Sequence, residues 1–349
     1  MANDTEFKVA TQCMTYNHAA YIEQTLKGFA IQQTAFPVVY VVVDDASTDG
    51  EPDVLRKWAA ENLADANAVG KPYGDLFFAR HKDNANAYFA ILLLAENHYQ
   101  TGRDKLKYEY IAQWCSKATY IALCEGDDCW INPNKLSMQV EYMDRFQDCV
   151  MTHTAFRYSK EGHFTANDAA EGTKFNLWAL EQGADIRPYI LDGNRYLIQT
   201  LTVLMRAQAY FKAMKEMQQY DGMFLMSDTI LWMTLLQYGR FHFFWQETAV
   251  YRLHADSATN QKSVARRVRF LLSCAEMRLT MAQKYDMPLA LKRKLYKQYN
   301  RMLTKYLWID RDYKPFVEVR YRNVFERMFY GLLRTRMAGA LGKKYYTKL

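Results

Sequence analysis

Two adjacent carboxylates, Asp127 and Asp128, follow the apolar run 120–123 inside the segment Glu125-Gly126-Asp127-Asp128-Cys129-Trp130. An apolar run that stops at turn-forming residues predicts a strand ending in a polar site. Because adjacent residues at a strand end face different ways, one carboxylate can ligate a hard divalent cation while the other binds a hydroxyl or water. This chemistry suits a sugar nucleotide, whose diphosphate travels with Mg²⁺ or Mn²⁺. An acidic turn that only caps the next helix is the alternative.

Strands and helices alternate along the first half of the chain. We predict strands over 7–14, 37–43, 76–79 and 120–123, with helices over 20–33, 52–62 and 86–97. This alternation indicates an α/β fold with a mainly parallel, Rossmann-like sheet flanked by helices, in which ligands bind beyond the carboxyl ends of the strands. The polar residues expected at those ends, together in one crevice, are Thr15, Tyr16, Asn17, Asp44, Asp45, Asn84, Asp127 and Asp128.

Three short segments of the chain carry a resemblance to a known family. They are Thr15-Tyr16-Asn17, the turn 43–50 with sequence VDDASTDG, and the turn 125–130 with sequence EGDDCW. On these motifs the chain resembles the family 2 glycosyltransferases of GT-A fold, most strongly over residues 7–160 and again over 226–254. The resemblance implies an inverting transfer of a sugar from a nucleoside diphosphate, favouring a UDP-sugar, to a saccharide or lipid-linked saccharide. It also implies a Mn²⁺ or Mg²⁺ cofactor and a role in bacterial surface-polysaccharide synthesis.

The resemblance gives each nucleotide-facing residue a role. Asp45 would accept a hydrogen bond from N3–H of uracil or thymine, and Tyr16 would lie beside that base. Thr15 and Asn17 would shape the loop that faces the nucleotide. Asp44 would orient the turn rather than contact the ligand. The Asp and Asn residues at these strand ends are also turn formers that need no ligand.

Further roles concern the cation. Asp127 would hold the ribose or a water of the cation's shell, and Asp128 would ligate the cation directly. His254, in a segment similar to the family's Y-R-x-H-x-x-S stretch, would complete the metal shell, although a lone His more often only hydrogen-bonds in a loop. Asn84 falls where the family places a polar contact to the nucleotide, but the glycine that usually follows is absent.

An inverting transfer needs a base that takes the proton of the acceptor hydroxyl. Asp228 begins a predicted helix that ends near Gly239 and is followed by a predicted strand over 240–245, which is similar to the family's base-bearing segment. The alternative is helix capping alone, worth about 1 kcal/mol. The nearby carboxylates Asp221 and Glu247 lack the downstream pattern.

Length and composition set the domain organisation. The 349 residues, 50% hydrophobic and 24% charged, predict one large domain and an appendage. We predict a GT-A domain over 1–258, with a nucleotide-binding half over 1–135 and an acceptor half over 136–258, and a basic, mainly helical region over 259–349. The sequence shows no paired cysteine spacing, no secretory signal and no run of about 18 apolar residues. We therefore expect a cytoplasmic protein that can associate peripherally with the inner face of the cell membrane.

The net charge of +7 is concentrated toward the carboxyl terminus. From Arg311 onward Lys and Arg outnumber the acids and alternate with apolar residues, which predicts a basic amphipathic helix. Such a helix could lie on an anionic membrane surface or pack on its own domain. Nucleic acid is not an expected partner, because no motif for it is present.

Two other functional classes compete with the enzyme. A catalytically silent GT-A module would bind a nucleotide sugar or scaffold an assembly complex. The presence together of four carboxylates argues against it; these are Asp45, Asp127, Asp128 and Asp228. A nucleotidyltransferase would need a Gly-rich basic loop after the first strand, which 15–18 does not offer. We assign no function to the segment 100–116. We expect the segment 164–196 to shape the acceptor site.

Overall fold

The computed structural model describes residues 5–101, 105–160, 163–165, 183–192, 197–253, 263–310, 313–316 and 328. The chain forms two compact units, which are described separately. Unit 1 comprises Met1–Gln182, Ile198–Lys212 and Leu235–Arg252, and unit 2 comprises Gly183–Leu197, Ala213–Thr234 and Leu253–Leu349. The domain boundary predicted at residue 258 stays a prediction.

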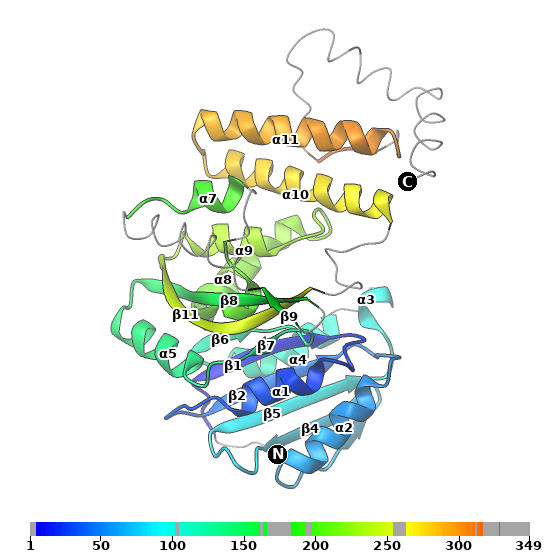
Figure 1. The fold of residues 1–349 in the computed structure, drawn as a ribbon, viewed down its shortest axis with the longest axis vertical. Coiled ribbons are helices and arrows are strands. Elements are labelled where there is room, and N and C mark those ends of the chain that lie inside the picture. The colour runs from blue at the N-terminus through cyan, green and yellow to red at the C-terminus, as the bar shows by residue number, and fades with distance from the viewer. Residues whose placement is uncertain are drawn as a thin grey trace. The chain divides into compact units, whose positions relative to one another are not determined.

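Unit 1 is built on a mixed sheet (Figure 1). Its strands are β1 (Val9–Thr15), β2 (Val38–Asp44), β3 (Val69–Lys71), β4 (Gly74–Arg80), β5 (Ala87–Leu94), β6 (Tyr120–Leu123), β7 (Cys129–Trp130), β8 (Cys149–Lys160), β9 (His163–Thr165), β10 (Leu204–Arg206) and β11 (Arg240–Leu253). Their order is β3-β4-β5-β2-β1-β6-β10-β8-β11-β7, with β9 paired to β8. The helical elements of this unit are α1 (Ile22–Ala30), α2 (Glu51–Asn62), α3 (His98–Thr101), α4 (Lys105–Cys115), α5 (Lys135–Arg145) and the 3₁₀ turn η1 (Thr200–Thr202).

The four central strands, β5-β2-β1-β6, are parallel, whereas both flanks of the sheet are antiparallel. In this register Thr15 lies opposite Asp44, and Asp44 lies opposite Leu93. The ends of β1, β2, β5 and β6 therefore meet at one edge, as predicted for an α/β fold of this class.

The helix predicted over 86–97 is wrong, because residues 87–94 form strand β5. This run is almost entirely apolar and buried, and a short continuous apolar run does not distinguish a buried strand from a buried helix. The strand predicted over 76–79 lies within β4, which pairs antiparallel with β5, and helices α3 and α4 lie between β5 and β6 in the chain.

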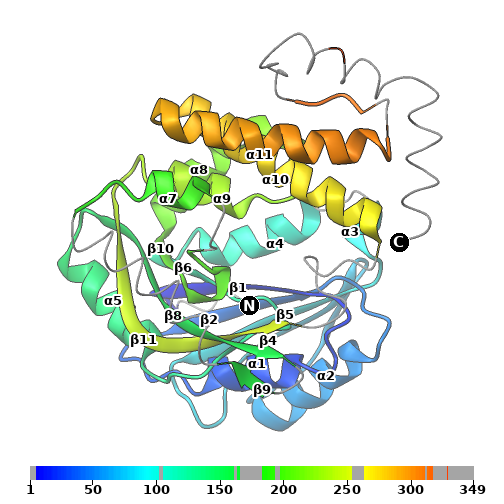
Figure 2. The same cartoon turned by 45° about the horizontal axis from the view of Figure 1, so that its top comes forward.

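Side chains of β2 alternate between two helical layers, since successive residues of a strand face opposite sides. Tyr40 stacks on Phe29 of α1 at 4.8 Å between ring centroids, and the same Phe29 meets Trp130 edge-on at 4.9 Å. On the other face α4 packs against β1 and β2. Figure 2 shows α1 and α2 on one side of the sheet and α4 on the other. The parallel strands are thus covered on both faces, which explains their continuous apolar sequence.

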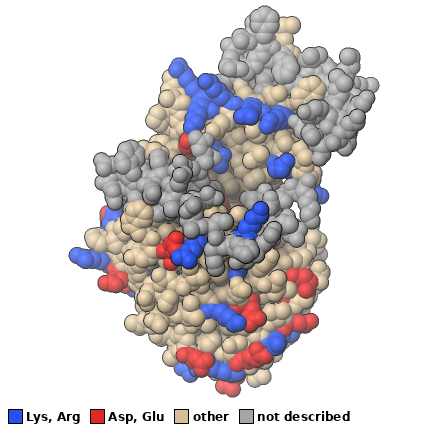
Figure 3. All heavy atoms as spheres, in the orientation of Figure 1, with Lys and Arg blue, Asp and Glu red and all other residues tan. Residues whose placement is uncertain are grey.

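Unit 2 is helical in its described part. It holds α7 (Arg187–Asp192), the C-terminal part of α8 (Ala207–Met217), the 3₁₀ turn η2 (Gln218–Tyr220), α9 (Asp228–Leu235), α10 (Val264–Lys284) and α11 (Leu289–Leu307). Helix α10 begins at a Ser263 cap whose hydroxyl accepts a hydrogen bond from the Arg266 amide. Helices α10 and α11 confirm the C-terminal helical extension, and Figure 3 shows Lys and Arg side chains gathered over them.

The basic helix predicted from Arg311 onward lies almost wholly outside the described residues. Among the helices that are described, none combines the length and the apolar character that crossing a bilayer requires. Most of the predicted acceptor segment 164–196 also lies outside the described residues.

Candidate active site

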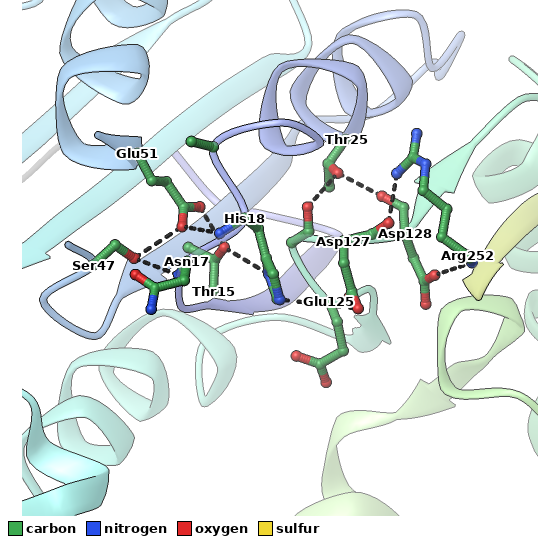
Figure 4. Close-up of polar contacts among 12 residues, drawn as sticks. Thr15, Asn17, His18, Thr25, Ser47, Glu51, Glu125, Asp127, Asp128 and Arg252 are labelled. Atoms are coloured by element: carbon green, nitrogen blue, oxygen red, sulfur yellow. Dashed lines mark hydrogen bonds and ion pairs between the residues drawn. The ribbon is translucent and has the colours of Figure 1, made fainter. Parts of the chain in front are cut away.

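Three loops come together at the carboxyl edge of the parallel strands (Figure 4). The loop after β1 and the turn after β2 are joined by the amide of Asp45, which donates to the Thr15 carbonyl at 3.0 Å. The turn after β6 joins the same strand, because the Gly126 amide donates to the Met14 carbonyl at 3.0 Å. The predicted crevice residues after β1, β2 and β6 therefore lie side by side.

Glu51, the first residue of α2, ties the first two loops together. Its carboxylate accepts hydrogen bonds from the Thr15 hydroxyl, from the His18 amide at 2.8 Å and from the Ser47 hydroxyl at 2.9 Å. A carboxylate is favoured at this helix start because the helix dipole is positive there. Glu51 was not among the predicted site residues. Its position directly after the D-G of the turn was the available signal.

The backbone of both loops is held in a strained form. Asn17 and Ala46 have φ angles of 58° and 59°, in the left-handed region that residues other than glycine rarely adopt. Two hydrogen bonds fix Asn17. Its backbone amide donates to the Ser47 hydroxyl, and its side-chain oxygen accepts from the Thr48 backbone amide, both at 2.8 Å. Strain of this kind persists only where the surroundings over-determine it, and it gathers at functional sites.

Asp44 orients the turn, as expected, because its carboxylate accepts hydrogen bonds from the Ser47 hydroxyl and, at 3.3 Å, from the Ser47 backbone amide. Burial raises the pKa of Asp44 to about 6, against the lowering effect of these hydrogen bonds. The pKa of Glu51 is also raised, mainly by burial and in part by the charge of Asp44. The site therefore holds carboxyl groups that resist ionisation without a compensating positive charge.

A pH dependence follows from Asp44. Its folded-state pKa lies above the unfolded value, so the folded protein binds more protons between about pH 4 and 6, and stability falls as the pH rises through that range. A shift of this size corresponds to about 3 kcal/mol. We expect Asp44→Asn, which keeps an acceptor for Ser47, to flatten the pH dependence of the urea midpoint between pH 4 and 7. An equally steep profile in the variant would contradict this assignment, and the exposed Asp53→Asn serves as the control.

Asp45 is buried and already engaged by its own chain. Its carboxylate accepts from the amides of His98 at 2.7 Å and Tyr99 at 3.1 Å and from the ammonium of Lys107 at 3.1 Å. A carboxylate offers about four lone-pair positions, so one remains for an outside donor such as a base N–H. The base contact of Asp45 stays a prediction. The segment 100–116, to which we assigned no function, supplies Lys107 and so shapes this part of the site.

The prediction that Asn84 joins the crevice is wrong. Asn84 precedes β5, at the opposite end of that strand, where its amide donates to the carbonyls of Ala30 at 2.8 Å and Gln32 at 2.9 Å. The error follows from reading residues 86–97 as a helix. Asn97 occupies the strand-end position instead, and its amide donates to the Asp45 carbonyl at 2.9 Å.

The turn after β6 is locked from two sides. The hydroxyl of Thr25 on α1 donates to the carbonyl of Gly126 at 2.9 Å and to that of Asp128. From β11, the Arg252 amide donates to the Asp128 carboxylate at 2.9 Å, while the Arg252 guanidinium donates to the Asp127 carbonyl. Arg252 therefore positions both aspartates through its backbone and its side chain.

His18 connects the loop after β1 to this turn. Its Nδ1 lies 3.1 Å from the Thr15 hydroxyl, and its Nε2 lies 3.9 Å from the Asp127 carboxylate. His18 was not among the predicted site residues. The structure adds it to the residues that contact Asp127, whereas Tyr16 stands half-buried in the same loop.

The donor set at this turn fits a hard cation. Asp128 is buried, and burial together with the charge of Asp127 raises its pKa, with Arg252 acting in the opposite sense. Adjacent oxygen ligands whose ionised form is disfavoured would be stabilised by a divalent cation. The described residues contain no group of three or more His, Cys, Asp or Glu side chains placed to hold a metal. Other ligands would have to come from a bound diphosphate, from water or from His254, which lies outside the described residues.

Gly126 allows the turn and the loop after β1 to approach each other closely. A Cβ atom at this position would lie 2.1 Å from the Thr15 hydroxyl oxygen and 2.5 Å from the Thr15 Cβ. We expect Gly126→Ala to lower the free energy of unfolding by about 1–3 kcal/mol and to weaken ligand binding at the turn. Gly70→Ala is the matched control, because a Cβ there meets nothing within 4 Å. Equal urea midpoints for the two variants would contradict this packing.

Asp228 belongs to unit 2, where it is the first residue of α9. The Leu231 amide donates to the Ser227 carbonyl at 3.0 Å, so Ser227 takes the capping position that we predicted for Asp228. The shift of one residue is within the usual uncertainty of a helix end. Asp228 is partly exposed and lies at the positive end of the helix dipole.

Comparison with known sequences gives relatives without a described function. No family model matches the chain. Uncharacterized proteins of Mycobacterium tuberculosis (Rv1520) and Mycobacterium bovis (Mb1547) are each 30% identical over 198 residues, which is 56% of this chain and 46% of the relative. The match thus spans about half the length of these curated relatives.

Comparison with solved structures identifies the fold. A mannosyltransferase, PcManGT from Pyrobaculum calidifontis in complex with GDP-Man and Mn²⁺, is similar over 97% of this chain and 87% of its own, with a TM-score of 0.51 and 12% identity. TarS 1–349 of S. aureus in complex with UDP covers 87% of this chain and 73% of its own at 13% identity, but at a TM-score of 0.47 we draw no argument from it. The chain has the GT-A fold, which confirms the fold predicted from its motifs.

Proposed function

We propose that this protein is an inverting, metal-dependent glycosyltransferase that moves a sugar from a nucleoside diphosphate, favouring UDP, to a saccharide or lipid-linked saccharide. One observation carries the proposal. The Asp127–Asp128 turn meets the loops after β1 and β2 at the carboxyl edge of parallel strands, where ligands bind in sheets of this kind. The similarity to a mannosyltransferase that binds GDP-Man and Mn²⁺ supports the same class of chemistry.

The donor would lie across the three loops. In this proposal, the base and ribose face the loop 15–17 and Asp45, while the diphosphate lies at Asp127 and Asp128. A Mn²⁺ or Mg²⁺ ion held by Asp128 would supply positive charge that offsets the charge developing on the departing diphosphate. Arg252 and Thr25 hold the Asp128 carboxylate and the backbone of the turn in place, so little reorganisation is needed when the donor binds.

The acceptor would be activated by Asp228. As its hydroxyl oxygen attacks the anomeric carbon from the face opposite the diphosphate, the carboxylate of Asp228 takes the hydroxyl proton. One bond to oxygen forms while the bond to the diphosphate oxygen breaks, so the configuration inverts. The proposed pathway is bacterial surface-polysaccharide synthesis on the cytoplasmic side of the membrane.

Release of nucleoside diphosphate from a panel of UDP-, dTDP- and GDP-sugars tests the proposal, with and without Mn²⁺ and with saccharide and lipid-linked acceptors. We expect one nucleotide class to be turned over, only with the cation, and faster with acceptor present. Binding of a nucleotide sugar without any turnover would instead identify a catalytically silent module.

A further inference from the structure

Helix α11 is strongly basic along its whole length. Its 19 residues include six Lys or Arg and no Asp or Glu. The apolar residues Leu295, Tyr299, Leu303 and Leu307 are buried, and α11 packs against α10 on that side. The apolar residues therefore hold α11 against α10, and the basic residues that form no ion pair within the described part of the chain remain available for an outside partner.

Part of this charge is neutralised within unit 2, but most is not. Lys292 pairs with Asp286 at 2.7 Å, and Lys294 pairs with Asp192. Across the part of the chain that the structure describes, Arg293, Lys297 and Arg301 are exposed and form no ion pair. Isolated cations in such number repel one another, which is unfavourable for the fold unless a counter-charge is bound.

These three residues recur every fourth position, which places them in one stripe along the helix. At a rise of about 1.5 Å per residue the stripe from Arg293 to Arg301 is about 12 Å long. Leu289 continues the same spacing by one step at the start of α11, and its side chain is 59% exposed. Figure 3 shows the blue side chains as a band that follows α11 across this face.

The charge of the chain is also segregated along the sequence. Residues 263–310 carry 11 Lys or Arg and 3 Asp or Glu, a net +8, and residues 311–349 carry 10 and 3, a net +7. Residues 1–262 carry 24 Lys or Arg and 32 Asp or Glu, a net charge of −8. An anionic surface would therefore attract residues 263–349 and repel residues 1–262.

We propose that the outer face of α11, defined by Arg293, Lys297, Arg301 and Leu289, docks on an anionic lipid bilayer. Basic residues beside such a surface each add favourable electrostatic energy, and an exposed apolar side chain at the end of the stripe inserts at the headgroup boundary. The exposed Leu289 favours a bilayer over a polynucleotide, which offers no apolar layer. This inference is separate from the proposed catalysis and from the predicted helix beyond Arg311.

Vesicle co-sedimentation of the full chain tests the docking face. The probes are vesicles of phosphatidylcholine alone and of phosphatidylcholine with phosphatidylglycerol in equal parts. We expect binding to the anionic vesicles only, and we expect Arg293→Gln/Lys297→Gln/Arg301→Gln to weaken it about a hundredfold. Leu289→Gln should weaken binding without changing its dependence on salt.

The matched control removes three positive charges from unit 1, with Lys57→Gln/Lys71→Gln/Lys117→Gln, all at exposed positions. It should bind the anionic vesicles as the unmodified chain does, and circular dichroism should show that both triple variants are folded. Equal vesicle binding by the two triple variants would overturn the proposal. Binding to duplex DNA that depends on the α11 residues, with no binding to anionic vesicles, would overturn it as well.

Discussion

Replacement of Asp128 by Asn is expected to remove cation-dependent nucleotide binding and to lower turnover by a factor of at least about a thousand, because a metal ion contributes several kcal/mol to a developing charge. The same variant should be as stable as the unmodified protein, or more so. Burial and the charge of Asp127 raise the pKa of Asp128, so its ionised form is unfavourable in the fold, and a neutral amide still accepts from the Arg252 amide.

Thermal unfolding with and without Mn²⁺ separates these two effects. The unmodified chain should be stabilised when nucleoside diphosphate and Mn²⁺ are added together, and Asp128→Asn should show no such shift. Asp83→Asn, at an exposed position away from the turn, is the control and should respond like the unmodified chain. A full Mn²⁺ response in Asp128→Asn would remove this residue from the cation site.

Asp228→Asn is expected to lower kcat by about 10²–10⁴, the range for loss of a general base, while nucleotide binding stays unchanged. Asn preserves the shape of the side chain at the start of α9, so a folding defect is not expected. Single-turnover transfer assays at saturating donor and acceptor measure the effect.

Asp221→Asn provides the comparison, because Asp221 is an exposed carboxylate of the same unit that lacks the helix-start position. It should retain nearly full activity. If Asp221→Asn loses activity and Asp228→Asn retains it, the base is assigned to the wrong residue. If neither variant loses activity, the base lies elsewhere.

The strands and turns that carry the motifs were predictable from the sequence. β2 is a continuous β-branched run closed by two aspartates, and the run before Glu125 ends as abruptly. In both cases the local composition and the sheet agree, so the position of the carboxylates followed from the general behaviour of parallel strands. The turn role of Asp44 was predictable for the same reason.

The contacts between distant residues were not predictable. Glu51 and Thr15 are 36 residues apart, and Lys107 and Asp45 are 62 apart. No spacing along the chain indicates that these side chains pair, because the pairing depends on how the elements pack. The misassignment of Asn84 has a different cause. It came from one local error, the apolar run of β5, which moved the expected strand end to the wrong residue.

Calorimetric titration of UDP, dTDP and GDP into the full chain, with and without Mn²⁺, tests the central claim most directly. We predict that one of the three binds, that binding requires Mn²⁺, and that UDP is the one. Binding of none of them, in either condition, would contradict a nucleotide and cation site at the Asp127–Asp128 turn.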